Sequence, residues 1–336
     1  MLTAASAALA RSEEPPMQED ETDAGPVGTP HVPVMEGQVV EGLCPRPGAR
    51  LVDATVGAGG HAAALLAAAP DTTLLGLDRD PVALDVARRR LAPFGDRVRL
   101  RQASFGTLSE ELAVEGWPAV DAVLLDLGVS SLQLDDPSRG FSFRARGPLD
   151  MRMGPDVGRS ADEIVNTWPE RDLADLIARL GEEPRARRIA RAIVRQRPIG
   201  DTEELATVVA SAAAASRRPG HHPATRTFQA IRMAVNDELA QLEAVLADGW
   251  ALLAPGGRFG VLAFHSLEDR RVKAAFRRWA ASCLCPPGLP ECRCGWTRRV
   301  RLVHGRARRP DEGETGRNRR ARSARWRVVE RIPEAS

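Results

Sequence analysis

The stretch from Leu51 to His61 constrains the fold of this chain more than any other, because an apolar run ends there in Asp53 and passes into a glycine-dense turn. The run has the length of a buried strand, and the alanine- and leucine-rich segment 62–69 favours a helix. Glycines let the backbone approach a ligand, and the first turn of a helix offers unpaired N–H groups. The stretch therefore predicts a strand that leads into a ligand-binding loop.

Strand-like and helix-like segments alternate on both sides of this stretch. Further strands are predicted at 73–78, 97–102 and 121–127, and a helix at 81–91 begins with Asp80 as its N-cap and a proline in its first turn. Continuous apolar strands separated by helices indicate a mostly parallel sheet that is covered on both faces. We therefore predict a doubly wound α/β domain.

The alternation stops after residue 134. A glycine- and proline-rich loop at 139–160 precedes predicted helices at 161–166, 170–180, 184–197 and 202–216. One long helix is predicted from 225 to about 253, and strands resume at 258–264, 300–303 and 326–332. We expect a sheet domain formed by 29–134 and 226–336, interrupted after its fourth strand by a helical insertion at 135–225 that binds the substrate.

The ends and the charge pattern add three expectations. Residues 1–28 mix alanines, acids and prolines without periodicity, which predicts a disordered extension. No segment has 18 uninterrupted apolar residues and no secretion signal is recognisable, so a cytoplasmic protein outside the membrane is expected. Six arginines in 185–197 and twelve in 298–327 predict contact with nucleic acid, although arginine fills nearly every cationic role in this chain, which has Lys273 as its single lysine.

Carboxylates at the predicted strand ends indicate which ligand the loop takes. The turn matches the dinucleotide pattern G-x-G-x-x-G/A, and Asp78 could accept both ribose hydroxyls of an adenosine. Asp53 and Asp126 favour S-adenosylmethionine (SAM), which carries a sulfonium and an ammonium, over a dinucleotide with an anionic pyrophosphate. A nicotinamide-dependent oxidoreductase is the alternative that the turn alone leaves open, and an RNA-binding assembly factor without catalytic activity is another.

A series of motifs then resembles one known family, the bacterial 16S ribosomal RNA (cytosine-N4)-methyltransferases. They include His31-Val-Pro-Val34, Asp53-Ala-Thr-Val-Gly-Ala-Gly-Gly-His61, Asp78-Arg-Asp-Pro81, Leu124-Leu-Asp-Leu-Gly-Val-Ser-Ser131, Gln133-Leu-Asp-Asp136, Arg139-Gly-Phe-Ser-Phe143, Gly147-Pro-Leu-Asp-Met-Arg-Met153, His222-Pro-Ala-Thr-Arg226, Val235-Asn-Asp-Glu-Leu239, Phe264-His-Ser-Leu-Glu-Asp-Arg270 and Asn318-Arg-Arg-Ala-Arg-Ser-Ala324. Because the motifs run in order from about residue 31 to 330, the resemblance covers nearly the whole chain.

The resemblance implies a class I SAM-dependent methyltransferase that methylates the exocyclic N4 of a cytidine in the decoding region of 16S rRNA, either as free RNA or in the small ribosomal subunit. It also implies the cofactor contacts, which are Gly59, Gly60, His61, Asp78, Phe105, Asp126 and Gln133. The sequence does not specify an oligomeric state.

The catalytic group is less well defined by the resemblance. Better-known amino methyltransferases carry an Asp/Asn/Ser-Pro-Pro-aromatic tetrapeptide after the fourth strand, and this chain has Asp126-Leu-Gly-Val there. Asp126 is a candidate to polarise the amino group or to accept its proton, and Ser130 and His265 are candidate contacts to the base.

Four of the five cysteines lie within twelve residues, as Cys283-x-Cys285 and Cys292-x-Cys294 in a proline-rich loop at 283–294. Four thiols at this spacing are a candidate zinc site. The C-x-C spacing is tighter than the usual C-x-x-C, so free thiols and disulfides stay open as alternatives, and a reducing cytoplasm disfavours disulfides.

Overall fold

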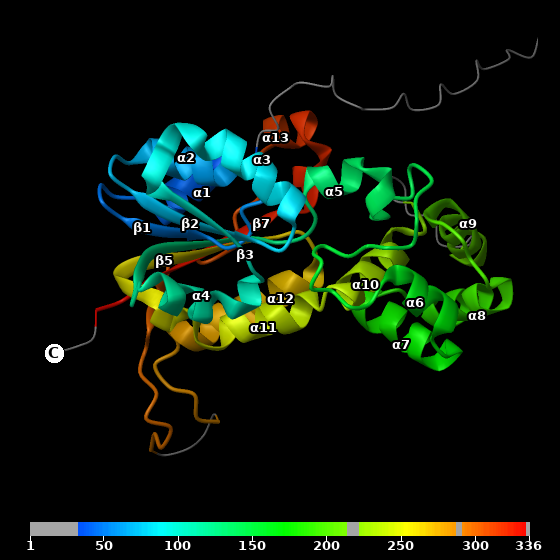
Figure 1. Cartoon of the computed structure of the whole chain (residues 1–336). Coiled ribbons are helices and arrows are strands. Elements are labelled where there is room, and N and C mark those ends of the chain that lie inside the picture. The colour runs from blue at the N-terminus through cyan, green and yellow to red at the C-terminus, as the bar shows by residue number, and fades with distance from the viewer. Residues whose placement is uncertain (1–32, 214–221, 287–290, 334–336) are drawn as a thin grey trace, which may run out of the picture. The chain divides into compact units, whose positions relative to one another are not determined.

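Seven strands form one sheet in a computed structural model that describes residues 33–213, 222–286 and 291–333. The order is β3-β2-β1-β4-β5-β7-β6, and the strands are β1 (Arg50–Asp53), β2 (Thr73–Asp78), β3 (Val98–Gln102), β4 (Val120–Asp126), β5 (Leu253–Ala263), β6 (Val300–Leu302) and β7 (Arg325–Arg331). The neighbours from β3 to β5 are parallel, whereas β7 is antiparallel to β5 and β6 (Figure 1). The predicted doubly wound, mostly parallel sheet is confirmed.

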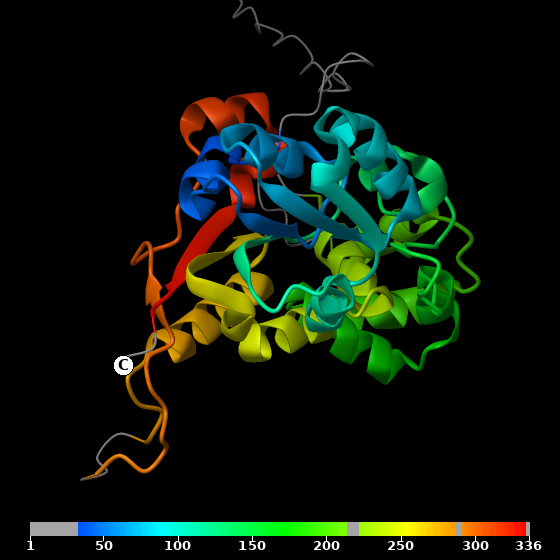
Figure 2. The same ribbon diagram turned by 60° about the vertical axis from the view of Figure 1, so that its left-hand side comes forward.

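Helices cover both faces of the sheet (Figures 1 and 2). One face carries α1 (Glu36–Leu43), α2 (Gly60–Ala68) and α3 (Pro81–Leu91), and the other carries α4 (Leu108–Glu115), α11 (Glu238–Asp248) and α12 (Ser266–Ala280). Successive strand residues point to opposite faces, so Leu51 packs in the first core and Val52 in the second. Burial on both sides explains why β1 is apolar at consecutive positions.

The register of the sheet brings three acidic residues to one edge. Asp53, the last residue of β1, pairs with Gly76 of β2 and with Leu124 of β4. β2 and β4 each run two residues further, to Asp78 and Asp126. The carboxyl ends of these three central strands therefore present one carboxylate each at the same edge, which is where doubly wound folds bind ligands.

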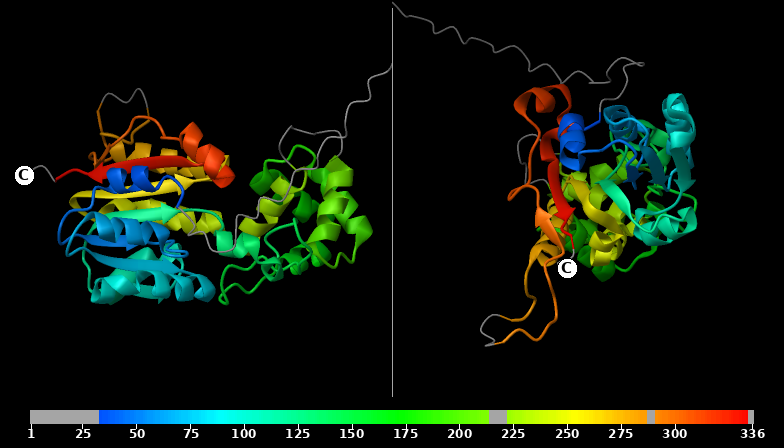
Figure 3. Two further views of the ribbon diagram at one scale, coloured as in Figure 1. Left: turned by 90° about the horizontal axis from the view of Figure 1, so that it is seen from above. Right: turned by 90° about the vertical axis from the view of Figure 1, so that its left-hand side faces the viewer.

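Only helices and loops lie between β4 and β5 in the described residues. They comprise α5 (Ser131–Asp135), α6 (Ala161–Thr167), α7 (Glu170–Gly181), α8 (Ala186–Gln196), α9 (Thr202–Ala213), α10 (Thr225–Val235) and α11. Helices α6 to α10 share a core of their own and lie beside the sheet (Figure 3). Phe228 and Ile231 of α10 belong to that core, and the predicted division into domains stays a prediction.

The prediction of a single long helix from residue 225 to about 253 is wrong. The structure has two helices, α10 and α11, with Asn236 and Asp237 between them. Asp237 adopts a left-handed backbone conformation with φ of 50°, which ends the helical hydrogen-bond pattern. The buried Asn236 side chain donates to Met151 O at 2.8 Å and accepts from Met153 N at 2.8 Å. These distant contacts stabilise a break that neither glycine nor proline marks in the sequence.

The remaining elements complete the edge of the sheet. The predicted last two strands are confirmed as β6 and β7. Along the chain, α13 (Glu312–Arg317) lies between these two strands. The predicted disordered extension at 1–28 lies outside the described residues. No helix in the described part of the chain combines the length and the apolar character that a bilayer span needs.

Candidate active site

The turn after β1 is shaped by glycines and closed by a carboxylate from the next strand. Gly59 has φ of 78°, a conformation that other residues rarely adopt, and a side chain at Gly60 would meet Pro33 Cγ at 2.5 Å. Asp78 Oδ2 accepts a hydrogen bond from Gly57 N at 2.8 Å. The turn is therefore tied to the end of β2, and α2 begins directly after it.

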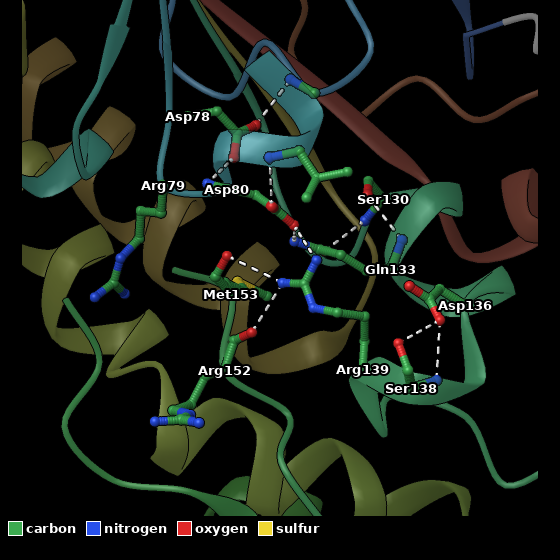
Figure 4. Close-up of polar contacts among 12 residues, drawn as sticks. Asp78, Arg79, Asp80, Ser130, Gln133, Asp136, Ser138, Arg139, Arg152 and Met153 are labelled. Carbon is green, nitrogen blue, oxygen red and sulfur yellow. Dashed lines mark hydrogen bonds and ion pairs between the residues drawn. The ribbon is translucent and has the colours of Figure 1, made fainter. Parts of the chain in front are cut away.

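Asp78 is held by backbone N–H groups on both of its carboxylate oxygens. Besides the bond from Gly57, its Oδ1 accepts from Asp80 N at 2.9 Å (Figure 4). Burial raises the pKa of Asp78 to about 6, although these N–H groups act in the opposite direction. Each oxygen keeps a further lone pair, so the carboxylate can still accept hydrogen bonds from a diol.

Asp53 is the most deeply buried acid of this edge, with 1% of its surface exposed. Its Oδ1 accepts from Thr55 N at 3.2 Å. Burial raises the pKa of Asp53 to about 7, and the nearby Asp126 and Asp78 add to that rise, whereas His61 opposes it. Near neutral pH this carboxyl group is consequently divided between its protonated and ionised forms.

His61 connects the first turn of α2 to the end of β4. Its Nε2 lies 2.9 Å from Val34 O, so this nitrogen carries a proton and donates, and its Nδ1 lies 3.4 Å from Asp126 Oδ2. Burial alone would lower the pKa of His61, but the hydrogen bond and the charge of Asp126 raise it overall. The ring and the Asp126 carboxylate therefore hold each other in place at this end of the sheet.

Asp126 is the acid of this edge that has a buried oxygen without a hydrogen-bond partner in the described residues. Its backbone N donates to Thr55 Oγ1 at 2.6 Å, which fixes the end of β4 against the turn after β1. Its Oδ1 is buried and has no hydrogen-bond partner among the described residues. A buried acceptor without a partner suits a ligand or substrate group that donates a hydrogen bond.

Phe105 follows the end of β3 in a short 3-10 helix, Phe105–Thr107, and packs against the core under α4 and α11. Ser104 caps this turn by accepting from Gly106 N at 3.0 Å. Since β3 lies next to β2, Phe105 occupies the edge of the sheet that also holds Asp78. The ring is partly buried, which agrees with an apolar wall.

Gln133 belongs to a network of polar contacts around Asp80 (Figure 4). The sequence gives no signal for this network, because its members are far apart along the polypeptide. Its Oε1 accepts from Ser130 N at 3.1 Å, and its Nε2 donates to Asp80 Oδ2 at 3.0 Å. Arg139 Nη1 also donates to Asp80 Oδ2, at 2.7 Å, while its Nη2 donates to Met153 O at 3.3 Å. Asp80 therefore does more than cap α3, because it connects β2 to both α5 and the loop before α6.

Ser130 and His265, the two candidate contacts to the base, each cap the N-terminus of a helix. Ser130 is the N-cap of α5, and its Oγ accepts from Gln133 N at 3.3 Å. His265 is the N-cap of α12 after β5, with its Nε2 3.0 Å from Glu268 Oε1. Glu268 Oε2 accepts from Phe264 N at 2.8 Å. Both residues lie at carboxyl ends of strands, in helix-capping roles.

The four predicted cysteine ligands lie outside this site, in the loop between α12 and β6. All four sulfur atoms lie within 4.8 Å of one another. The structure thus brings the two C-x-C pairs together, as the spacing predicts.

The donor set fits SAM on a physical ground that the sheet edge supplies. No arginine forms an ion pair with Asp53, Asp78 or Asp126 in the part of the chain that the structure describes. Three carboxylates around a glycine turn, with His61 as their one close basic side chain among the described residues, suit a ligand that is itself cationic. The strand order, with β7 reversed between β5 and β6, together with this edge defines a class I SAM-dependent methyltransferase.

Comparisons with known proteins identify the family. The chain matches the MraW methylase family over residues 28–332. Proteins named "Ribosomal RNA small subunit methyltransferase H" are 52% identical in Syntrophobacter fumaroxidans, over 90% of this chain and 96% of the relative, and 50% identical in Thermomicrobium roseum, over 91% and 95%. The relative in Geobacter sulfurreducens is 49% identical, over 90% and 99%. The chain belongs to the MraW methylase family, which argues against the oxidoreductase alternative.

Proposed function

We propose that this methyltransferase transfers a methyl group from SAM to the exocyclic N4 of a cytidine in the decoding region of 16S rRNA, in the cytoplasm where small subunits assemble. The observation that carries the proposal is the sheet edge with three carboxylates, Asp53, Asp78 and Asp126, around a glycine turn. The names of the relatives and the order of the sequence motifs support the choice of RNA and of acceptor atom.

The residues of the edge divide the recognition of SAM among them. Asp78 would accept the ribose hydroxyls, and Phe105 would pack on the adenine. Gly59 and Gly60 would let the backbone approach the ligand, while Asp53 would attract its cationic end. Gln133, which already uses both ends of its amide within the protein, would act by holding α5 against Asp80 beside the ligand.

SAM, when bound, supplies an electrophilic methyl group on a cationic sulfur. The protein has two remaining tasks, because the N4 lone pair of cytosine is delocalised into the ring. The base must be held in line with the methyl group, and the amino group must lose a proton.

Asp126 is the group we assign to that proton. Its Oδ2 faces His61, and its Oδ1 has no partner in the described residues, so Oδ1 can accept a hydrogen bond from the amino group. A hydrogen bond in that direction orients N4 and increases its electron density before transfer. His61 then acts as a positioning residue, because its ring holds the carboxylate. Ser130 and His265 would contribute contacts to the base from the adjoining helix caps.

The arginines of α8 are the surface we assign to the RNA backbone. Ile189 and Ile193 are buried, whereas Arg187, Arg191 and Arg195 are exposed on the opposite side of the helix. Among the described residues, the ion pairs of α8 involve Arg191, which lies 3.5 Å from the exposed Glu170, whereas several arginines of the C-terminal run are paired, as Arg301 is with Glu330. If the three α8 arginines contact phosphates, replacing all three with glutamine should reduce the salt slope of RNA binding by about 2.

A matched control for that experiment replaces Arg88, Arg89 and Arg277, which are exposed on α3 and α12. Binding of 16S rRNA would be measured by filter retention at several salt concentrations. An equal loss in both triple variants would mean that total charge, and no particular surface, determines affinity. An unchanged slope in the α8 variant would reject this surface.

One labelling experiment tests the reaction. Small-subunit particles that lack the modification, and free 16S rRNA in a parallel sample, are incubated with methyl-labelled SAM and digested to nucleosides. We expect N4-methylcytidine, and we expect Asp126→Asn to transfer little label even at SAM concentrations that calorimetry shows to saturate the variant. Label on a ring carbon would overturn the acceptor atom. RNA binding without any transfer would favour the non-catalytic assembly factor.

A further inference from the structure

The four clustered cysteines have the sulfur geometry of a tetrahedral metal site. Cys283 Sγ lies 3.4 Å from Cys292 Sγ and 3.8 Å from Cys294 Sγ, and the last two are 3.5 Å apart. Cys285 Sγ lies within 4.8 Å of all three. A tetrahedral ion with zinc–sulfur bonds of about 2.3 Å separates its ligands by about 3.8 Å. The cluster therefore already approximates the edges of that tetrahedron.

No apolar core explains why these sulfurs converge. We define the cysteine tip as residues 282–286 and 291–295, where every described side chain is exposed except the half-buried Cys285. Leu284, its large hydrophobic residue, is 42% exposed. A segment that buries so little cannot offset its loss of chain entropy by packing, and small units of this kind usually depend on disulfides or a metal.

Disulfides do not fit the arrangement. All four cysteines are free, and the shortest sulfur separation given above is far longer than a disulfide bond of about 2.05 Å. A fourfold cluster is the expected pattern for one shared ion, and tetrahedral sulfur sites take zinc or iron.

Backbone N–H groups point at the sulfurs, as they do around metal-bound thiolates. Leu284 N donates to Cys294 Sγ, Cys285 N donates to Cys283 Sγ, and Arg293 N donates to Cys285 Sγ, each at 3.3 Å. Such bonds stabilise negative charge on sulfur and orient the ligand. Backbone N–H groups thus face three of the four sulfurs, as the second shell of a metal–thiolate site requires.

The base of the tip is anchored to the sheet domain independently of the cysteines. Trp296 Nε1 donates to Ala281 O at 3.2 Å, and the Arg299 guanidinium lies 4.7 Å from the Trp250 ring and 5.5 Å from the Trp296 ring. This stem fixes where the two arms of the loop leave the domain. At the cysteines themselves, the two arms are joined by N–H···S hydrogen bonds to the sulfurs, which a shared ion would reinforce.

We propose that Cys283, Cys285, Cys292 and Cys294 bind one zinc ion that folds the cysteine tip. The site is structural, because four protein ligands leave no open position for a substrate. It is separate from the methyl-transfer site, so the proposal does not depend on the reaction proposed above.

Metal analysis of the full-length protein, purified without chelators, tests this site. We expect about one zinc per chain by inductively coupled plasma mass spectrometry, and below about a tenth of an equivalent in C292S/C294S. Cys44→Ser is the matched control, because Cys44 is an exposed free cysteine outside the cluster, and it should keep the full equivalent. The double variant should melt within about 2 °C of the wild type, since the tip buries almost nothing.

A second measurement uses cobalt as the probe and does not depend on the folding of the double variant. The wild-type protein exchanged with Co²⁺ should show thiolate-to-cobalt charge-transfer absorption and the visible bands of tetrahedral cobalt, and Cys44→Ser should show the same spectrum. Less than half an equivalent of zinc after zinc loading and dialysis would overturn the proposal. So would iron in place of zinc, disulfides in the intact mass, or equal zinc in C292S/C294S.

Discussion

Buried carboxylates occur in two regions of this molecule with opposite electrostatic surroundings. At the ends of β1 and β2, burial raises the pKa of Asp53 to about 7 and of Asp78 to about 6. In the first turn of α12, burial acts in the same direction on Glu268 and Asp269, yet their pKa values are lowered because His265 and arginines face them. Burial of a carboxyl group is therefore accompanied by a raised pKa in the first region and by a lowered pKa in the second.

The difference is informative because arginine is abundant in this chain. Asp269 binds both Arg325, at 2.8 Å, and Arg327, at 2.7 Å, so the fold can supply guanidinium groups to buried acids where it needs them. The acids of the glycine turn have no such partner in the described residues. We infer that the α12 acids serve stability, whereas the carboxylates of the turn are kept for a cationic ligand, at a cost to the free protein.

The substitution Asp53→Asn, studied without ligand, is the strongest test of this difference between the two groups of acids. An acid with a raised pKa holds extra protons in the folded state, so its contribution to stability falls as pH rises from 3.8 to about 7. Asparagine removes that penalty, and above pH 7 the free energy of unfolding should increase by up to about 4 kcal/mol. Denaturant unfolding at pH 5 and pH 8 measures it. A variant less stable than the wild type at pH 8 would contradict the comparison.

Asp269→Asn should have the opposite sign. It leaves Arg325 and Arg327 without their shared carboxylate, and Asp269 has only 6% of its side chain exposed. We expect the free energy of unfolding at pH 7 to fall by about 3 kcal/mol, at the low end for a broken buried pair because Arg325 can partly reach water. Chemical denaturation with Asp121→Asn as an exposed control checks this. If the free energy of unfolding fell by less than about 0.5 kcal/mol, the ion pairs of Asp269 would be worth no more than exposed salt bridges.

Asp78→Ala should affect the ligand more than the fold. The change removes the acceptor for Gly57 N and Asp80 N as well as the one assigned to the ribose. The ligand would lose its hydrogen bonds from the ribose hydroxyls to this carboxylate. We therefore expect SAM affinity to fall about 30-fold, or about 2 kcal/mol. Isothermal titration calorimetry measures it, with Asp85→Ala on the surface of α3 as the control. Equal affinity in both variants would show that Asp78 does not hold the ribose.

The sequence was enough to predict this edge because each of its parts is local. An apolar run followed by an acid predicts a strand end, and parallel strands place their carboxyl ends together, so Asp53, Asp78 and Asp126 could be assigned to one edge without a structure. The helices of the insertion were equally accessible from their periodicity. In both cases the signal lies within about ten consecutive residues.

Contacts between distant segments gave no such signal. Arg139 reaches Asp80 across 59 positions, and Asn236 reaches Met151 across 85, where it supports the break between α10 and α11. Periodicity reports which face of a helix is apolar, and the apolar positions continue across that break in phase with one helix. A side chain that satisfies distant carbonyl groups can end a helix that local propensity would extend. Such residues become visible only when the chain is folded.

The pH dependence of SAM affinity is the smallest effect and the most specific one. A cation bound beside Asp53 favours its ionised form, and with a pKa of about 7 that form rises from about a tenth of the population at pH 6 to about nine tenths at pH 8. Affinity should therefore increase by up to about tenfold over this range.

Calorimetry across this range, with S-adenosylhomocysteine in parallel, identifies which charge Asp53 senses. That product has the same ammonium group but lacks the sulfonium, so a similar rise for both ligands would assign Asp53 to the amino-acid end, and a rise confined to SAM would assign it to the sulfur. Asp53→Asn should flatten the profile in either case. A wild-type affinity that falls between pH 6 and pH 7.5 would mean that the buried carboxyl of β1 is not kept for a cation, and the contrast with α12 would then concern folding alone.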